Sequence, residues 1–138
     1  MLYKPVVLVG GIVHKNGKIL LLKRLDSKKF FPGHWEMPGG KLNEGENPAE
    51  AIIRETKEET GFDVSIKQVY NTWADTILNN ETKEHVIEID FILNLKDAQD
   101  VRLSEKEHSA YKWVGKGELP KPITPQMHRT LELAFNYL

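Results

Sequence analysis

The chain has 138 residues, a mass of 15.8 kDa, a formal net charge of −1 and no cysteine. The lack of cysteine excludes disulfides, zinc–thiolate sites and cysteine nucleophiles, and the near-neutral charge gives no general attraction to nucleic acid or membranes. The longest apolar run, PVVLVGGIV, is far below the roughly 20 residues of a membrane-spanning helix. We therefore expect a single domain over residues 1–138 and a cytoplasmic protein.

The N-terminal quarter predicts a β-hairpin followed by a loop. Residues 6–13 are rich in β-branched side chains, and the Asn16-Gly17 pair is a tight-turn signal. A second apolar run follows at residues 18–25. Residues 26–34 then predict a loop, which leads into a short extended segment and a Pro-Gly-Gly sequence.

The middle of the chain predicts one well-bounded helix. Pro48 suits the first helical position, Asn47 suits the N-cap, and Gly61 provides the stop, so the helix should run from residue 48 to about residue 60. The rest of the chain predicts, in order, a strand pair or one bent strand at 63–77, a turn at 79–82, strands at 85–95 and 109–114, a proline-containing loop, and a terminal helix at 126–138. Two helices among several strands predict a mixed sheet covered by helices.

The predicted helix carries an acidic face. With a turn of 100° per residue and Glu55 at zero, Glu58 falls at about 300° and Glu59 at about 40°. The apolar stripe lies about a third of a turn away and contains Ala49, Ile52, Ile53 and Thr56. Like-charged pairs at i,i+3 and i,i+4 destabilise a helix by about 0.2–0.5 kcal/mol each. A divalent cation would reverse this effect, and three glutamates supply the hard oxygen ligands that suit Mg²⁺ or Mn²⁺.

These glutamates belong to a longer pattern of fixed spacing. It consists of a glycine, a glutamate, an Arg-Glu pair, a Glu-Glu pair and a second glycine, here Gly40, Glu46, Arg54, Glu55, Glu58, Glu59 and Gly61. This pattern resembles the signature of the Nudix hydrolases. Thr56 is the one departure, since the signature has an aliphatic residue there; its methyl group can pack and its hydroxyl can bond a carbonyl one turn back.

The resemblance extends over nearly the whole chain. We call the pattern from Gly40 to Gly61 the box, and Glu55, Glu58 and Glu59 the box glutamates. The sequence PGHWEMPGG, which leads into the box, and the segment from Glu107 to Trp113 after it are similar to those of MutT-type members. The resemblance implies the α/β/α sandwich of this family, with a mixed β-sheet between helices. It also implies an enzyme that splits a nucleoside diphosphate linked to another group.

The resemblance further implies the roles of individual residues. Metal ions would be held by Glu55, Glu58, Glu59 and the carbonyl of Gly40, and Arg54 would orient the glutamates with support from Glu46. The water proton would pass to a box glutamate, for which we choose Glu58, or to a distant carboxylate. Glu107 resembles the distal glutamate of MutT-type members, and Glu105 is a near competitor.

The substrate class follows from comparison among the branches of the family. The coenzyme A branch has an arginine-containing motif that residues 21–40 lack, and the ADP-ribose branch tends to have a proline where residues 76–78 are Thr, Ile and Leu. The dinucleoside polyphosphate branch tends to have a tyrosine that residues 78–80 lack. The chain therefore looks most like the MutT-type group, which converts nucleoside triphosphates to monophosphate and pyrophosphate. Residues 120–126 contain no asparagine corresponding to the one that MutT-type sanitising enzymes use on oxidised guanine, and Ile123 lies near that position, which argues against that specificity.

Base recognition requires a stacking aromatic and a few edge hydrogen bonds. We select Phe31, Trp35, Trp73 and His85 as candidates, with Phe30 as a neighbour, and we assign Trp113 to the core. The five histidines show no metal-ligand spacing. They are His14, His34, His85, His108 and His128.

Two other functions stay open. One is the same chemistry on ADP-ribose, a nucleotide sugar or another diphosphate-linked metabolite, and the other is a non-catalytic Nudix module that binds a nucleotide and reports it to a partner. The intact glutamate set argues against the second. The expected partner is a small nucleoside di- or triphosphate derivative rather than nucleic acid or a membrane, with Mg²⁺ (or Mn²⁺) as cofactor, and the chain is expected to be a monomer or homodimer.

Overall fold

The computed structural model describes residues 2–78 and 82–138. In chain order the elements are β1 (Leu2–Lys15), β2 (Lys18–Arg24), β3 (Trp35–Glu36), β4 (Gly39–Lys41), α1 (Pro48–Thr60), β5 (Val64–Leu78), β6 (Thr82–Leu95), β7 (His108–Val114), α2 (Pro125–Ala134) and the 3₁₀ helix η1 (Phe135–Tyr137). Among the described helices, none has the length and apolar character needed to cross a membrane. The predicted turn at 79–82 falls largely outside the described residues.

The sheet is mixed, as the sequence predicts. Its strand order is β3-β2-β1-β6-β5, with β4 paired to β1 and β7 paired to β2. β1 runs parallel to β6 over a long register that includes Val6 opposite Val86 and Val13 opposite Leu93, whereas the β5–β6 and β2–β7 pairs are antiparallel. The predicted hairpin is present, but β1 and β2 pair only next to the turn at Asn16 and Gly17, both of which have positive φ. Beyond this turn the two strands diverge to different partners.

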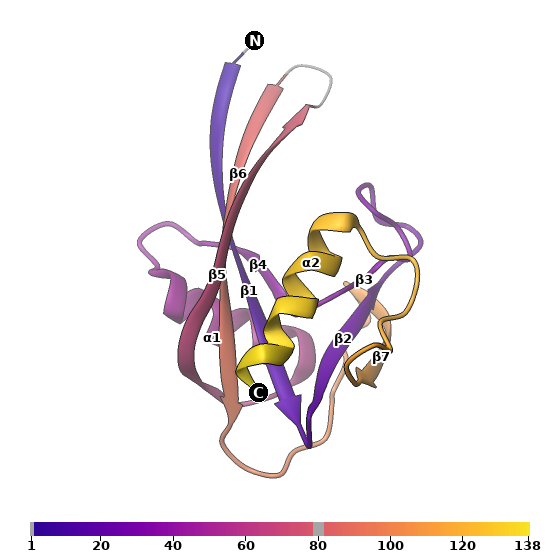
Figure 1. The fold of residues 1–138 in the computed structure, drawn as a ribbon. Coiled ribbons are helices and arrows are strands. Elements are labelled where there is room, and N and C mark those ends of the chain that lie inside the picture. Colours follow the sequence, from indigo (N-terminus) through magenta and orange to yellow (C-terminus); the bar gives the residue numbers. More distant parts are fainter. Residues whose placement is uncertain (1, 79–81) are drawn as a thin grey trace.

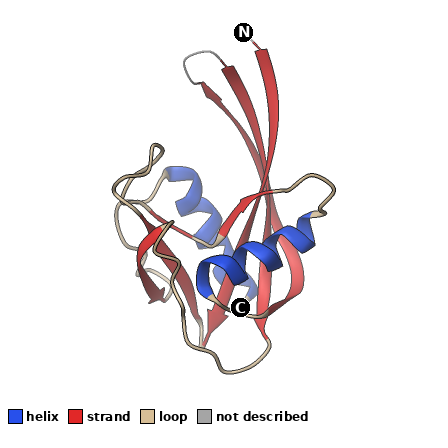
Figure 2. Cartoon of the chain, turned by 180° about the vertical axis from the view of Figure 1, so that it is seen from behind, coloured by secondary structure: helices blue, strands red, loops and turns tan. Residues whose placement is uncertain are grey.

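The two helices lie on opposite faces of the sheet. α2 is in front of the strands in Figure 1, and α1 is in front of them in the reverse view of Figure 2. Alternate residues of one strand therefore enter two cores: Leu20 and Leu22 of β2 pack with Ile52 of α1, while Ile19 and Leu21 pack with Leu131 of α2. Burial of both faces explains why these strands read as continuous apolar runs. The family's three-layer α/β arrangement is confirmed.

Helix α1 begins and ends at the predicted residues. The side chain of Asn47 accepts a hydrogen bond from the Glu50 amide, Pro48 occupies the first turn, and Gly61 closes the helix with φ 77°. Its faces differ from the expectation. Ile53, placed on the core stripe by the helical wheel, is 39% exposed, whereas Glu59 is only 5% exposed and lies inside the buried arc.

Thr56 also differs from its expected role. The residue is fully buried, so its methyl group packs as predicted, but its hydroxyl makes no hydrogen bond with any residue in the described ranges. The carbonyl of Thr56 instead accepts a hydrogen bond of 2.6 Å from the Thr60 hydroxyl.

Two features of the sheet shape the region around the site. Strand β4, which the sequence analysis did not predict, places Gly39 and Gly40 opposite Gly10 and Val9 of β1, so the Pro-Gly-Gly segment is fixed against the central strand. β5 is one strand with register shifts rather than two. The ends of β1, β5 and β6 project beyond the helices as a three-stranded arm (Figure 1).

Candidate active site

The three box glutamates lie on one side of α1 but in different environments. The side chains of Glu59, Glu55 and Glu58 are 7%, 16% and 58% exposed, respectively. The series follows from the helix orientation, because Glu59 faces the sheet while Glu58 faces solvent. The site therefore combines a buried, an intermediate and an exposed carboxylate within two turns.

Arg54 braces this cluster. Its Nε and Nη2 donate to the two carboxylate oxygens of Glu46 at 2.7 and 3.0 Å, while Nη1 donates to Glu55 at 2.9 Å and to Glu58 at 3.2 Å. Nη2 also donates to the carbonyl of Lys41 at 3.1 Å. The guanidinium lowers the pKa of Glu46 to about 2, so Glu46 remains ionised and fixes Arg54. One planar group thus orients two of the three box glutamates.

The glycines before the helix allow β4 to lie against these carboxylates. A Cβ at Gly40 would lie 2.6 Å from the carboxyl carbon of Glu55, so only glycine leaves the Glu55 carboxylate in its place. The amide of Gly39 donates to Glu59 Oε1 at 2.9 Å. The Pro-Gly-Gly segment and the helix therefore form one unit.

Burial and mutual repulsion raise the proton affinity of the inner carboxylates. Burial raises the pKa of Glu59 to about 9, and the charges of Glu36, Glu55 and Glu107 add to the rise. Burial also raises the pKa of Glu55, although Arg54 opposes the shift. Such a cluster is poorly compensated by protein groups alone, and a divalent cation would favour its ionised form. The residues thus fit the metal ions that the family pattern implies.

Glu59 also belongs to a second cluster that the sequence analysis missed. His108, which we expected to have no metal-related placement, is 2% exposed at the start of β7 and lies between Glu59 of α1 and Glu36 of β3. One potential ligand atom from each of the three residues lies within 4.8 Å of the others. The sequence offered one signal for this cluster. Glu36 and His108 both lie in segments that resemble MutT-type members, the first just before the Pro-Gly-Gly segment and the second directly after Glu107.

The charge of Glu107 contributes to the raised pKa of both Glu55 and Glu59. Its side chain is 50% exposed and accepts a hydrogen bond of 2.6 Å from Lys28 Nζ. The Glu107 carbonyl accepts a bond from the amide of Leu25. Glu107 thus holds the loop between β2 and β3 through Leu25 and Lys28.

The four aromatic candidates have different surroundings. Phe31, in the loop after β2, is 51% exposed and has φ 49°, a strained value for a bulky residue. Trp35 is partly buried against the core beneath α2, and Trp73 on β5 donates its indole N–H to Glu88 at 2.8 Å. His85 lies near the start of β6, opposite Pro5 of β1.

Beside Trp73 is a buried carboxyl pair that sequence reasoning also missed. Glu88 is 7% exposed and Asp90 is fully buried, and burial raises the pKa of both groups. Asp90 Oδ2 accepts a hydrogen bond from Asn71, but Oδ1 has no hydrogen-bond partner among the residues described. A Cβ at Gly10 would lie 2.7 Å from this oxygen, so the pair is packed against β1.

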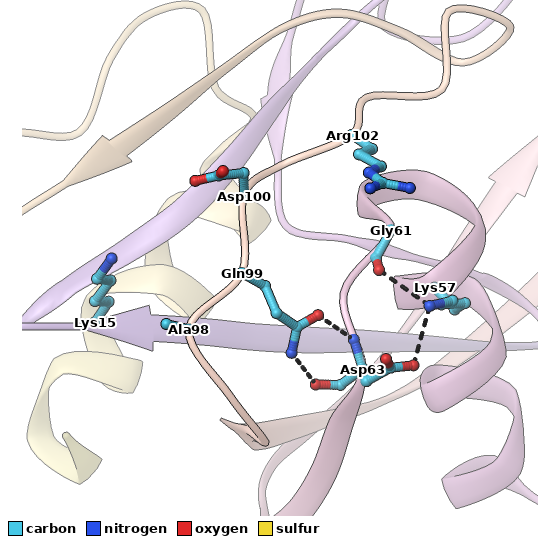
Figure 3. Close-up of a pocket in the computed structure, with 8 residues that line it drawn as sticks. All are labelled: Lys15, Lys57, Gly61, Asp63, Ala98, Gln99, Asp100 and Arg102. Atoms are coloured by element: carbon cyan, nitrogen blue, oxygen red, sulfur yellow. Dashed lines mark hydrogen bonds and ion pairs between the residues drawn. The ribbon is translucent and has the colours of Figure 1, made fainter.

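A separate pocket of about 570 Å³ lies beyond the C-terminal end of α1 (Figure 3). Its polar groups bond to one another: Lys57 contacts the Gly61 carbonyl and Asp63, and Gln99 exchanges two hydrogen bonds with the Asp63 backbone. None of the box glutamates lines it. We assign no ligand to this pocket.

The geometry at α1 and β4 agrees with a known family. The model of the NUDIX domain matches residues 2–134, nearly the whole chain. The chain belongs to the Nudix hydrolase family. Hydrolases of this family generally use divalent metal ions, in agreement with the carboxylate cluster.

Relatives of several activities are similar to this Nudix chain. An ADP-ribose pyrophosphatase of Methanocaldococcus jannaschii is 38% identical over 73% of this chain, although the match spans only 60% of that relative. A nucleoside triphosphatase, NudI, of Escherichia coli O81 (strain ED1a) is 32% identical over 78% of this chain and 79% of the relative. An 8-oxo-dGTP diphosphatase of Proteus vulgaris is 34% identical over 58% of this chain and 67% of its own length.

Solved structures support the same family. A MutT NUDIX hydrolase from Burkholderia pseudomallei superposes with a TM-score of 0.75 and 26% identity, covering 94% of this chain and 98% of that chain. A MutT protein from Methanosarcina mazei Go1 gives a TM-score of 0.71 and 26% identity, covering 99% and 96% of the two chains. The chain is a Nudix hydrolase of the MutT type.

Proposed function

We propose that this Nudix hydrolase is a Mg²⁺-dependent pyrophosphohydrolase that cleaves a nucleoside triphosphate to nucleoside monophosphate and pyrophosphate. The observation that carries the proposal is the Arg54-braced cluster of Glu55, Glu58 and Glu59. Residues 76–78 lack the proline that the ADP-ribose branch tends to have, which favours a triphosphate over ADP-ribose as the substrate. NudI, named a nucleoside triphosphatase, matches most of both chains, which supports the same substrate class.

The proposed chemistry assigns a task to each group. Divalent cations, when bound, neutralise the phosphate oxygens and acidify a water. Glu55 and Glu59, with the Gly40 carbonyl, are the inner ligands because they are the more buried groups beside β4. Glu58 is the proposed general base, because it is the most exposed box carboxylate and Arg54 holds it at 3.2 Å.

The loop before β3 is the proposed support for the nucleotide. Lys28 of this loop forms an ion pair with Glu107, whose charge acts on Glu55 and Glu59, so this pair can position a substrate between the loop and the glutamate cluster. Phe31 presents an exposed ring on a strained backbone, and such strain is often found at ligand-binding sites. Phe31 is therefore our first choice for base stacking. Trp35, Trp73 and His85 are second choices, since Trp35 and Trp73 have structural contacts.

The test is hydrolysis of a substrate panel with and without Mg²⁺, with products identified by mass. The panel contains normal and modified nucleoside triphosphates, ADP-ribose, nucleotide sugars and dinucleoside polyphosphates. Glu58→Gln should lower turnover by about 10²–10⁴-fold, the usual contribution of a general base. Glu50→Gln is the matched control, because Glu50 lies on the same helix outside the cluster and glutamine can replace it at the N-terminal cap.

The panel also tests a second candidate, an ADP-ribose pyrophosphohydrolase. The 38% identity with the archaeal ADP-ribose pyrophosphatase favours it. Cleavage of ADP-ribose alone, abolished by Glu58→Gln, would replace the triphosphate proposal and keep the site. Binding of a nucleotide without turnover of any compound would overturn both and favour a non-catalytic module.

A further inference from the structure

His108 is a buried side chain that the proposed hydrolysis does not use. Its imidazole lies where β3, α1 and β7 meet. Nε2 is 2.8 Å from Glu36 Oε2, and Nδ1 is 3.5 Å from Glu59 Oε2. The ring is only 2% exposed, so bulk water does not provide hydrogen-bond partners for its two nitrogen atoms.

The contact with Glu36 determines which ring nitrogen has a free lone pair. Arg24 Nη1 lies 3.3 Å from both carboxylate oxygens of Glu36 and orients this carboxylate. At 2.8 Å, Glu36 accepts the Nε2–H of His108, so the lone pair of a neutral ring lies on Nδ1. Within the described part of the chain, Nδ1 makes no hydrogen bond. A histidine that ligates a metal usually donates its other ring N–H to a carboxylate in this way.

The second contact has the geometry of two ligands rather than of a hydrogen bond. A separation of 3.5 Å exceeds the usual 2.7–3.2 Å of an N–H···O bond. Two ligand atoms at about 2.1 Å from one cation are 3.5 Å apart when they subtend about 113°, close to a tetrahedral angle. Glu59 Oε1 already accepts the Gly39 amide, which leaves Oε2 directed at the ring.

We propose that His108 Nδ1 and Glu59 Oε2 ligate one divalent cation, and that Glu36 orients the imidazole for this purpose. The inference rests on the proposed function only in placing a cation at Glu59. Its consequence is a distinction between metals. Mg²⁺ prefers oxygen ligands. An imidazole nitrogen binds Zn²⁺ more strongly than Mn²⁺, and it can ligate either of these two metals. The position at His108 therefore takes a transition metal, whereas the neighbouring position at Glu55 and the Gly40 carbonyl offers oxygen ligands only.

Pulsed electron paramagnetic resonance of the Mn²⁺-loaded full chain tests this ligation directly. The wild type should show the hyperfine coupling of a directly bonded imidazole ¹⁴N. His108→Gln should lose this coupling, because glutamine can still donate to Glu36 but offers no Nδ1. His128→Gln, which changes a half-exposed histidine on α2, should keep it. Absence of the coupling in the wild type, or its persistence in His108→Gln, would overturn the proposal in favour of an imidazole that only bridges two carboxylates.

A second measurement needs no variant, which matters because His108 is buried. Nuclear magnetic resonance of histidine-¹⁵N-labelled wild type, titrated with Zn²⁺, should shift Nδ1 of one buried histidine while its Nε2 stays protonated. No such shift at equimolar Zn²⁺ would refute the ligation. Neither experiment contains a substrate, so failure of the hydrolysis panel would overturn the proposed function without changing these results. In calorimetry, His108→Gln should weaken Mn²⁺ binding by at least about tenfold and Mg²⁺ binding less.

Discussion

The substitution Gly40→Ala should disturb the glutamate cluster while leaving the stability of the fold nearly unchanged. A Cβ at this position lies 2.6 Å from the Glu55 carboxyl carbon and Oε1, whereas ordinary contact begins at 3.4 Å. The carboxylate must therefore retreat by about 0.8 Å, the difference between these two distances. Its neighbour is the end of a flexible side chain, and the Gly40 backbone is outside the left-handed region, so the free energy of unfolding should change by less than about 1 kcal/mol.

The effect on turnover should be much larger. Misplacement of a reacting group by about 1 Å can lower the rate by about 100-fold, which corresponds to about 2.7 kcal/mol of activation free energy. The assay measures Mg²⁺-dependent hydrolysis of the best substrate at saturation, with thermal unfolding of the same preparation. Calorimetric titration with Mg²⁺ should show weakened binding, because Glu55 is a proposed ligand.

Gly39→Ala is the matched control on the adjacent residue. Its Cβ would lie 2.2 Å from the carbonyl oxygen of Val9, part of the central strand, which cannot rotate away. This variant should be destabilised by about 1–3 kcal/mol or more. The reasoning would be refuted if Gly40→Ala kept full turnover, or if it lost stability to the same extent as Gly39→Ala.

The remaining predictions concern buried or bridging polar groups. Thr56→Val should stabilise the protein by about 1 kcal/mol in urea denaturation, because it removes a buried hydroxyl without a hydrogen bond among the described residues; an unchanged midpoint would count against this. Arg54→Lys should lower turnover by at least about tenfold, because one ammonium cannot reach Glu46 and Glu55 together; wild-type kinetics would contradict it. Burial raises the pKa of Asp90, so the folded protein keeps a proton on this group that the unfolded chain releases above about pH 4. Because the folded state then binds more protons than the unfolded state, the free energy of unfolding falls as the pH rises. Asp90→Asn should flatten this fall between pH 5 and 9 in thermal unfolding, and an unaltered slope would show that another group causes it.

Features determined by neighbouring residues could be predicted from the sequence. The bounds of α1 follow from Asn47, Pro48 and Gly61, each of which acts through its own backbone or side chain. The turn at Asn16 and Gly17 is equally local. The spacing of the box likewise placed its glutamates on one side of a helix, since helical geometry depends only on residue number.

Features that depend on distant partners could not be predicted in the same way. The helical wheel does not say where the sheet lies, so Ile53 was assigned to the core and Glu59 to a separate acidic face. His108 is 72 residues from Glu36 in sequence, and only the pairing of β2 with both β3 and β7 brings them together. The buried Asp90 was missed for the same reason: residues 85–95 were predicted only as a strand, and the strand pattern does not show which side chains other elements cover.

The parallel pairing of β1 with β6 has a consequence for synthesis on the ribosome. The central strand β1 emerges before its partner β6, because Val86 follows its pairing residue Val6 by 80 positions, so this pairing forms late. Closing so long a loop costs chain entropy before any contact repays it, and such topologies fold slowly. Meanwhile the nascent chain exposes the apolar run at residues 5–13, a segment of high β-propensity. Newly made protein should therefore depend on chaperone protection until the second half of the sheet has left the ribosome.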